Sequence, residues 1–254
     1  MAVLRETVTE KINRILGIND SYKAPARIME VLFDRECRED VFKQFVNDPE
    51  LCKTEEDVFH VYFQEEHADR KDKKQDFTPG SVGDLLAGLV DGGGDNDSRT
   101  SYDGCAGTGG LTISKWHADR LKHSPFDYKP SWYFYHCEEM SDRAIPFLLF
   151  NLLFRGMNAV VVHCDVLTRK SKGAFFIQND RDDFMHFSSL NVLPYTDLTA
   201  SELNVVWDDD LIPYEDLIES EEIPDHVLNP SEYGTISAET KFLHLLCGID
   251  AEVF

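Results

Sequence analysis

The stretch SYDGCAGTGGLTISKW (Ser101–Trp116) is the most informative part of this sequence. It places four glycines within seven positions, between a short run typical of a β-strand and a run typical of a helix. A glycine-rich turn between a strand and a helix leaves backbone amides free at the helix N-terminus and lets a ligand approach the main chain. Because a GxG pattern is also typical of a simple tight turn, the surrounding sequence has to distinguish the two interpretations.

Segments that are typical of strands and of helices alternate around this turn. In chain order they are TSYD, LTISKWHADRL, WYFYHC, AIPFLLFNLLFRG and AVVVHCDVL. This alternation predicts βαβ units and therefore an α/β fold in which helices cover a parallel sheet. The turn would then lie at the C-terminal edge of the sheet, where open α/β folds bind their ligands.

The N-terminal part of the chain has a different pattern. Apolar residues recur three and four positions apart up to about residue 70, which is typical of amphipathic helices. A charged connector, EEHADRKDKKQ (Glu65–Gln75), follows. We therefore expect a helical subdomain over residues 1–74 and an α/β domain with an acidic C-terminal segment over residues 75–254.

The composition is that of a soluble globular protein. The chain has 254 residues, of which 42% are hydrophobic, and this is enough for a substantial core. No run approaches the roughly 18 apolar residues of a membrane helix, and the N-terminus lacks the apolar core of a signal peptide. The six cysteines form no CxxC pair and no zinc-like combination with histidine. We therefore expect a cytoplasmic protein with reduced thiols, no membrane partner and no metal.

The net charge of −22 is unusual for a protein that binds nucleic acid, because such proteins normally present a basic surface to the phosphates. Residues 201–254 contain 14 Asp and Glu residues and one Lys, so this segment carries −13 of the total. Three interpretations remain open: a solvated acidic face, a surface that binds a basic protein partner, and a surface that imitates DNA. The dense cationic cluster Arg70, Lys71, Lys73 and Lys74 could contact phosphate or form an ordinary linker.

The residues of the turn make the ligand interpretation more specific. Asp103-Gly-Cys-Ala-Gly-Thr-Gly-Gly110 resembles the first motif of N6-adenine DNA methyltransferases, in which an acid ends the first strand and glycines surround S-adenosylmethionine. It does not resemble a Walker loop, because no Lys-Ser or Lys-Thr pair follows. The next strand ends in Glu138 and Glu139, and we expect Glu139 to accept hydrogen bonds from the ribose. The resemblance implies that the turn binds cofactor through Asp103, Gly104, Ala106, Gly107 and Gly109.

The segment beyond the second strand extends this resemblance. EMSDRAIPFLLFNLLFRGMNAVVVHCDVL (Glu139–Leu167) is similar to the modification subunits of type I restriction-modification systems, with Asn151, Gly156 and Asp165 in register. The resemblance implies that Asp165 lies near the exocyclic amine of the cofactor's adenine. Upstream, Gln75-Asp76-Phe77-Thr78-Pro79 is similar to an element that closes over the methionine end of the cofactor in this family, which implies roles for Phe77 and Thr78. We therefore expect a Rossmann-like S-adenosylmethionine-dependent methyltransferase fold.

The catalytic motif of the family, Asn-Pro-Pro-aromatic, has two partial matches. In these enzymes the Asn side chain and a backbone carbonyl accept hydrogen bonds from the amine of a flipped adenine, and the aromatic ring stacks on the base. The first match is Asn191-Val-Leu-Pro194-Tyr195, which follows an apolar strand at the expected distance from Asp103. The second is Asn229-Pro-Ser-Glu-Tyr233, in which an anionic Glu would lie beside the base. We prefer Asn191, Pro194 and Tyr195 as catalytic candidates.

Three functions are compatible with these observations, and we prefer the first. It is a compact adenine-N6 DNA methyltransferase of a phage or mobile element, whose DNA contacts we expect a separate specificity subunit to help supply. The second is an inactive, acidic relative that binds a protein partner, for example as an anti-restriction factor. The third is a methyltransferase that acts on protein or on a small molecule. Only 59 residues follow Tyr195, so we expect the last strands of the fold to be reduced or missing.

Overall fold

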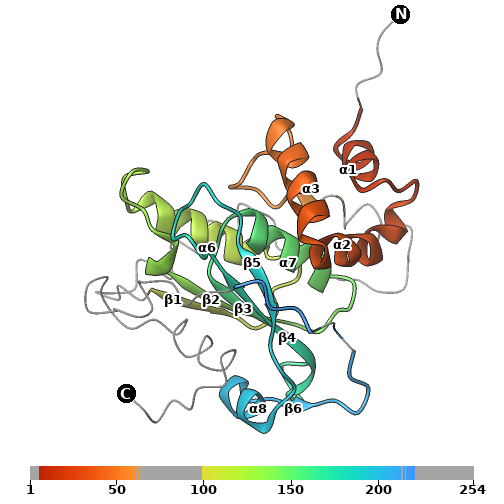
Figure 1. Cartoon of the computed structure of the whole chain (residues 1–254), viewed down its shortest axis with the longest axis vertical. Helices are drawn as coiled ribbons and strands as arrows, with labels where there is room; N and C mark the ends of the chain where they lie inside the picture. Colours follow the sequence, from red (N-terminus) through yellow and green to blue (C-terminus); the bar gives the residue numbers. More distant parts are fainter. Residues whose placement is uncertain (1–5, 61, 63–98, 213, 215, 221–254) are drawn as a thin grey trace, which may run out of the picture.

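The described residues form a mixed six-stranded β-sheet, and the chain has an α/β fold (Figure 1). The computed structural model describes residues 6–60, 62, 99–212, 214 and 216–220. Strands β1 to β5 lie side by side in sequence order, and β6 pairs with β4. Their bounds are β1 Thr100–Asp103, β2 Phe134–Glu139, β3 Ala159–Cys164, β4 Lys170–Gln178, β5 Ser189–Val192 and β6 Val206–Trp207.

The first three strands form the parallel βαβαβ unit that the sequence predicts. β1 pairs with β2 and β2 with β3 in parallel, through helices α6 (Gly110–Leu121) and α7 (Ile145–Phe154). Both helices lie on one face of the sheet (Figure 1), as the rule of right-handed crossovers predicts when successive strands are added on the same side. The C-terminal ends of the three strands therefore meet at one edge, next to the N-terminus of α6.

The second half of the sheet departs from the predicted all-parallel arrangement. β4 is antiparallel to β3, and β5 is antiparallel to β4. The link between β3 and β4 is only Asp165–Arg169, whereas a parallel crossover needs a dozen or more residues. This short link makes a hairpin, in which Arg169 has a φ of 60°. The chain therefore adds β4 and β5 beyond β3, on the side of the sheet away from β1.

The N-terminal segment is helical, as predicted. Its described helices are α1 Val8–Leu16, the short 3-10 helix η1 Ser21–Lys23, α2 Ala24–Phe33 and α3 Arg35–Asn47. Thr7 caps α1 reciprocally with Glu10, Gly17 closes it with a φ of 70°, and the side chain of Asp34 caps α3. Further along the chain lie η2 Pro130–Trp132 and α8 Asp197–Leu203. None of the helices in the described ranges is long and apolar enough to cross a membrane.

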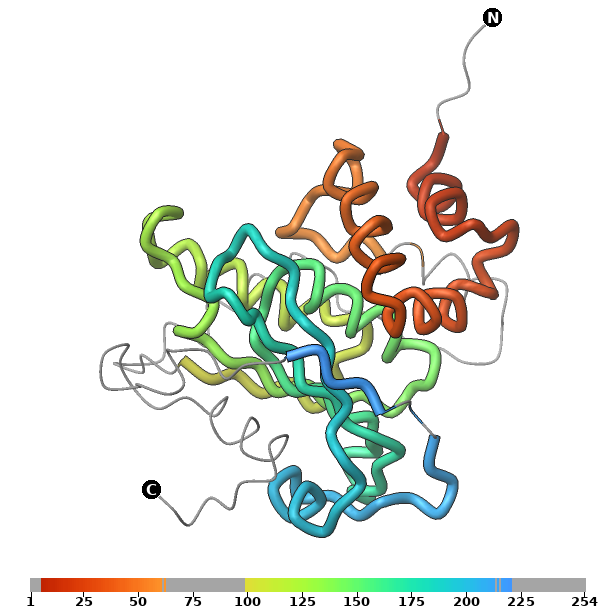
Figure 2. Tube along the Cα trace, viewed as in Figure 1, coloured from red at the N-terminus to blue at the C-terminus, as the bar shows by residue number. Residues whose placement is uncertain are grey.

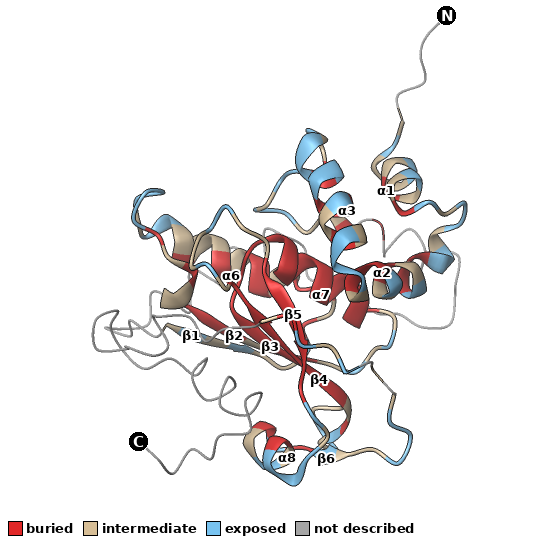
Figure 3. Ribbon diagram, viewed as in Figure 1, coloured by how far each residue is buried: buried red, intermediate tan, exposed pale blue. Residues whose placement is uncertain are grey.

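Helix α7 joins the N-terminal helices to the sheet. All ten of its residues are buried (Figure 3), because one side lies on the sheet and the other contacts α2 and α3. Phe42 and Phe45 of α3 pack their rings against Phe150 of α7 at centroid distances of 4.7 and 4.8 Å. The N-terminal helices, α7 and one face of the sheet thus share one hydrophobic core. The other face has a smaller core that α8 covers through Leu203.

Two glycines with left-handed backbone conformations differ in how closely other atoms approach them. Gly156 has a φ of 65°, and a Cβ at this position would lie 2.4 Å from the carbonyl oxygen of His186. Gly17 has a φ of 70°, but a Cβ there would have no atom within 4 Å. We expect Gly17→Ala to lower the free energy of unfolding by about 1 kcal/mol, the cost of the left-handed conformation alone. Gly156→Ala should lower it by about 3 kcal/mol, because the backbone must also move.

Urea denaturation of the two variants measures this difference. Equal losses of stability in Gly17→Ala and Gly156→Ala would contradict the close approach of residues 156 and 186.

Candidate functional site

The glycine turn, defined here as residues 104–109, connects the C-terminal end of β1 to the start of α6. Gly107 and Gly109 have φ values of 58° and 97°, a region that strongly favours glycine. The amide of Ala106 donates to the carbonyl of Glu138 at 3.0 Å, which fixes the turn to the end of β2. Gly109 is the N-cap of α6 and supplies no side chain to its free amides. The turn therefore presents main chain, rather than side chains, at this edge of the sheet.

Glu139 lies at the end of β2 and contacts the turn directly. Its Oε2 accepts a hydrogen bond from the amide of Gly107 at 2.8 Å, and its Oε1 accepts one from the amide of Ser141 at 2.7 Å. A carboxylate oxygen has two lone pairs, so each oxygen of Glu139 can accept one further hydrogen bond. The side chain is half-buried, which leaves it accessible to a ligand.

Glu138 has a different environment, on the opposite face of β2. Its buried carboxylate forms a two-pronged ion pair with Arg169, at 2.5 and 2.9 Å. Burial favours a higher pKa for Glu138, but hydrogen bonds from His136 and Arg169 outweigh it and lower the pKa to about 2. Arg169 also donates to the carbonyls of Leu203 and Asn204, so this ion pair holds the end of α8 against the sheet. The structure thus places Glu139, and not Glu138, at the glycine turn.

Asp103 supports the turn from its first residue. Its carboxylate accepts hydrogen bonds from the amide of Cys105 at 3.3 Å and from the hydroxyl of Thr112 at 3.0 Å. Burial raises the pKa of Asp103, and these two donors oppose the rise. Gly104 needs no special backbone conformation, but a Cβ there would lie 2.9 Å from the hydroxyl of Tyr102. Asp103, Gly104, Ala106, Gly107, Gly109 and Glu139 therefore form one continuous site.

Among the described residues, Asp165 is the predicted cofactor residue that does not join this cluster. Asp165 follows β3 at the same edge of the sheet, but its carboxylate accepts hydrogen bonds from the amide of Leu167 and the hydroxyl of Thr168, both at 2.9 Å. It thereby stabilises the β3–β4 hairpin. Phe77 and Thr78 lie outside the described residues.

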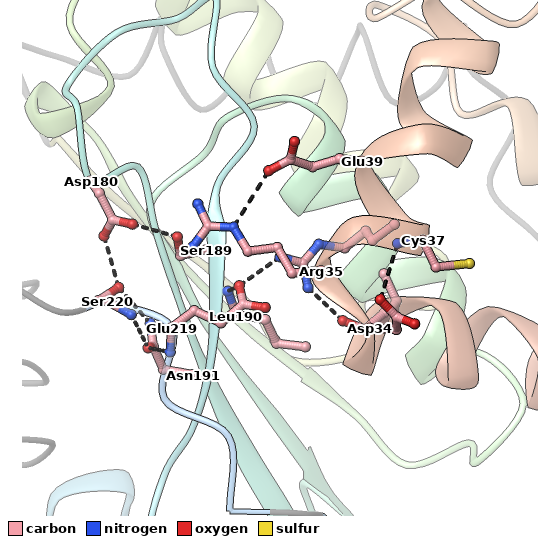
Figure 4. Close-up of polar contacts among 12 residues, drawn as sticks. Asp34, Arg35, Cys37, Glu39, Asp180, Ser189, Leu190, Asn191, Glu219 and Ser220 are labelled. Carbon is pink, nitrogen blue, oxygen red and sulfur yellow. Dashed lines mark hydrogen bonds and ion pairs between the residues drawn. The ribbon is translucent and has the colours of Figure 1, made fainter.

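The amide of Asn191, the preferred catalytic candidate, is fully used inside the protein. The side chain is 0% exposed, and its oxygen accepts hydrogen bonds from the amides of Glu219 and Ser220 at 2.9 and 3.0 Å (Figure 4). Its nitrogen donates to the carbonyl of Phe176 and to the hydroxyl of Ser220. Residues 216–220 consequently lie alongside β5 (Figure 2), with an isolated bridge between Asn191 and Ile218.

Pro194 and Tyr195 also lie away from the glycine turn. Pro194 is exposed, and the hydroxyl of Tyr195 lies 2.7 Å from the carbonyl oxygen of Ile212. The Tyr195 ring packs edge-on against Trp207 at 5.0 Å. β5 is four strand spacings of about 4.8 Å from β1, or roughly 19 Å. The structure does not bring the three catalytic candidates to the turn, because the hairpin adds β4 and β5 beyond β3, on the side of the sheet away from β1. The alternative motif at Asn229 lies outside the described residues.

Two residues carry no local sequence signal, one that contacts the glycine turn and one that contacts Glu138 on the other face of the sheet. Arg169 reaches Glu138 from the β3–β4 hairpin, and Asp57 reaches the turn from the N-terminal segment, where it accepts a hydrogen bond from the hydroxyl of Thr108 at 2.5 Å. Both contacts join residues that are distant in the sequence, so neither spacing nor periodicity could reveal them. Asn151 did carry a sequence signal, because it is in register with the family that the sequence resembles. Its side-chain nitrogen donates to the carbonyl of Thr108 at 2.7 Å.

Comparisons with known proteins add no further identification of this site. The chain matches no protein-family model, no curated protein and no solved structure. Within the described part of the chain, no group of three or more His, Cys, Asp or Glu residues could hold a metal ion.

His163 links the site to the segment after Glu139 and gives the protein a testable pH dependence. Its Nδ1 lies 2.8 Å from the hydroxyl of Tyr214, and its Nε2 lies 3.1 Å from Asp142 and 3.2 Å from the carbonyl of Met140. Burial lowers the pKa of His163 below its ordinary value of 6.5; Asp142 opposes this shift, and the Lys172 ammonium, which pairs with Asp142, adds to it. As the pH drops below 6.5, His163 therefore binds a proton more readily in the unfolded chain than in the folded protein. The free energy of unfolding should fall in this range.

We expect the free energy of unfolding of the wild-type protein to decrease between about pH 7.5 and about pH 5.5. The decrease should be smaller in His163→Gln, which cannot titrate. Urea denaturation at the two pH values measures the slope, and an unchanged slope in His163→Gln would exclude His163 as its source.

Asn191→Ala should behave as a structural substitution. Loss of its hydrogen bonds leaves the amides of Glu219 and Ser220 without their acceptor, and we expect unfolding to become easier by about 2 to 4 kcal/mol. Urea denaturation measures this loss of stability. Unchanged stability in Asn191→Ala would contradict the structural role of its amide.

Proposed function

We propose that this chain is an S-adenosylmethionine-binding, adenine-N6 DNA methyltransferase-like protein with a Rossmann-like fold, and that the glycine turn binds the cofactor. The observation that carries the proposal is the hydrogen bond between the Gly107 amide and Glu139. It joins a glycine-rich turn after one parallel strand to an acid at the end of the neighbouring strand. This is the arrangement in which a dinucleotide or nucleoside ligand is held by main chain on one side and by a ribose-binding acid on the other.

The charges around the turn favour a cationic ligand over a phosphate. Asp103 and Glu139 place two carboxylates against the turn, and both are held by amide or hydroxyl donors rather than by Lys or Arg. These carboxylates repel a phosphate group and attract the sulfonium and amino groups of S-adenosylmethionine. The free acceptor capacity of Glu139 suits the ribose hydroxyls. When bound, S-adenosylmethionine would supply an electrophilic methyl group.

The acceptor side of the reaction depends on groups other than Asn191. Polarising an adenine amine requires hydrogen-bond acceptors next to the cofactor's methyl group. In the sequence, Asn229-Pro230 is the other candidate for this role. A chain of net charge −22 also favours a separate specificity subunit that supplies the phosphate contacts. DNA as the substrate fits the cytoplasmic location that the composition predicts.

A second candidate function is a methyltransferase-like protein that acts by binding alone. The observation that favours it is the structural use of Asn191, Pro194 and Tyr195, which leaves the described residues without an acceptor-binding motif at the turn. The negative charge of residues 201–254 would then bind a basic protein surface. Neutralising Asp208, Asp209 and Asp210 should weaken such binding more at low salt than at high salt.

Calorimetry with S-adenosylmethionine and S-adenosylhomocysteine tests the cofactor site. We expect Glu139→Ala to weaken binding by about 1.5 to 3 kcal/mol, because a charged hydrogen-bond acceptor is lost. Glu138→Gln is the matched control, since it alters the neighbouring acid on the other face. It should reduce stability through the loss of its ion pair with Arg169 and leave the affinity nearly unchanged. Weaker binding in Glu138→Gln but not in Glu139→Ala would show that Glu138, and not Glu139, binds the ribose.

Transfer of labelled methyl groups from the cofactor to adenine-containing DNA separates the two functions. Label in N6-methyladenine, with or without an added specificity subunit, supports the enzyme. Cofactor binding without any transfer, together with stoichiometric inhibition of a restriction enzyme, supports the binding protein. Absence of binding to either cofactor would overturn the proposed site itself.

A further inference from the structure

A chain of buried and half-buried polar groups connects the N-terminal segment to the centre of the glycine turn. Asp57 accepts a hydrogen bond from the hydroxyl of Thr108 at 2.5 Å through one oxygen, and one from the side-chain nitrogen of Asn151 at 2.9 Å through the other. The same nitrogen of Asn151 donates to the carbonyl of Thr108 at 2.7 Å. Thr108 is thus held through its side chain and its backbone by residues from outside the turn.

Arg155, which directly follows α7, continues this chain of contacts into residues 54–57. Its guanidinium donates to the carbonyls of Thr54 and Glu56, each at 2.7 Å, and to the carbonyl and side-chain oxygens of Asn151, each at 2.9 Å. Arg155 is 4% exposed, and burial lowers its pKa to about 10, a shift that the nearby Asp57 charge opposes. The group therefore stays charged at neutral pH, and it fixes the backbone on both sides of Glu55.

The glycine turn needs such external support. Thr108 lies between Gly107 and Gly109, both with left-handed backbone conformations, and glycines lose more conformational freedom on ordering than other residues. Glu139 holds the amide of Gly107 on one side. On the other side, the contacts from Asp57 and Asn151 fix Thr108, which is 2% exposed. A turn ordered before the ligand arrives avoids the entropic cost of ordering it on binding.

We propose that Asp57 is a positioning residue of the cofactor site, which acts through the hydroxyl of Thr108 and couples cofactor binding to the docking of residues 54–57 on α7. The identity of the ligand in this inference rests on the proposed function. The contact of Asp57 with Thr108 and its effect on the turn do not depend on it. Coupling between two sites is reciprocal, so whatever displaces residues 54–57 weakens the cofactor site, and bound cofactor holds these residues in place.

The test uses the full chain with substitutions at both ends of the contact. Asp57→Ala and Thr108→Val should each weaken S-adenosylhomocysteine binding about 10-fold in calorimetry, because each removes a hydrogen bond to a charged group. The double variant should lose no more than either single variant, since both break the same contact. Thr108→Ser keeps the hydroxyl and should retain wild-type affinity. Glu56→Ala is the matched control, because it removes a neighbouring, 59% exposed carboxylate and leaves the backbone carbonyl that Arg155 contacts.

Amide hydrogen exchange without ligand tests the structural part separately. The amides of Gly107 and Gly109 are hydrogen-bonded in the folded protein, so a peptide covering residues 104–113 should exchange slowly. Exchange of this peptide should become faster in Asp57→Ala and Thr108→Val, and should stay at the wild-type rate in Glu56→Ala and Thr108→Ser.

The outcomes separate the two proposals. Faster exchange in Asp57→Ala and Thr108→Val, in a chain that binds neither cofactor, would support the positioning contact and overturn the proposed function. Wild-type exchange and affinity in both variants would overturn the role of Asp57. Additive losses in the double variant would show that Asp57 does not act through Thr108. Equal losses in Glu56→Ala would show a general charge effect instead of a specific contact.

Discussion

The complete burial of α7 is the constraint on which the rest of this structure depends. A helix with the sequence IPFLLFNLLF has no polar face, so it must be covered on all sides. The sheet covers one side, and the N-terminal helices cover the other through residues such as Phe42 and Phe45. The helical segment and the α/β unit therefore share one hydrophobic core, and neither could expose its part of α7 to water without losing a large buried apolar area.

This shared core also determines what can reach the candidate site. Docking the N-terminal segment on α7 brings Asp57 to the glycine turn, where its carboxylate meets the hydroxyl of Thr108. Asn151 inside α7 and Arg155 directly after it are polar residues that need partners, and they find them in the turn and in the backbone of residues 54–56. Buried polar groups are costly unless they are satisfied, so these contacts and the burial of α7 support each other.

The short β3–β4 hairpin, in contrast, keeps the predicted catalytic segment away from the candidate site. It turns the chain away from β1, so Asn191 joins the far side of the sheet, and its amide holds residues 219 and 220 instead of a substrate. Glu219 also forms a buried ion pair with Arg38 of α3 at 2.6 Å. These contacts fasten residues 216–220 to both β5 and the N-terminal helices.

The sequence by itself determined the elements and the core of the candidate site. Hydrophobic periodicity located the N-terminal helices, the strands β1 to β3 and the helices between them, because these signals depend only on neighbouring residues. The proximity of the glycine turn to the acids at the ends of β1 and β2 could also be predicted, since parallel strands bring their C-terminal ends to one edge of the sheet. Tertiary structure alone decided that Glu139 and not Glu138 faces the turn, that Asp57 supports it, and that Asn191 lies roughly 19 Å away. Strand direction after β3 and contacts between distant segments follow from the global packing of α7 and from the length of one hairpin, and no local pattern encodes them.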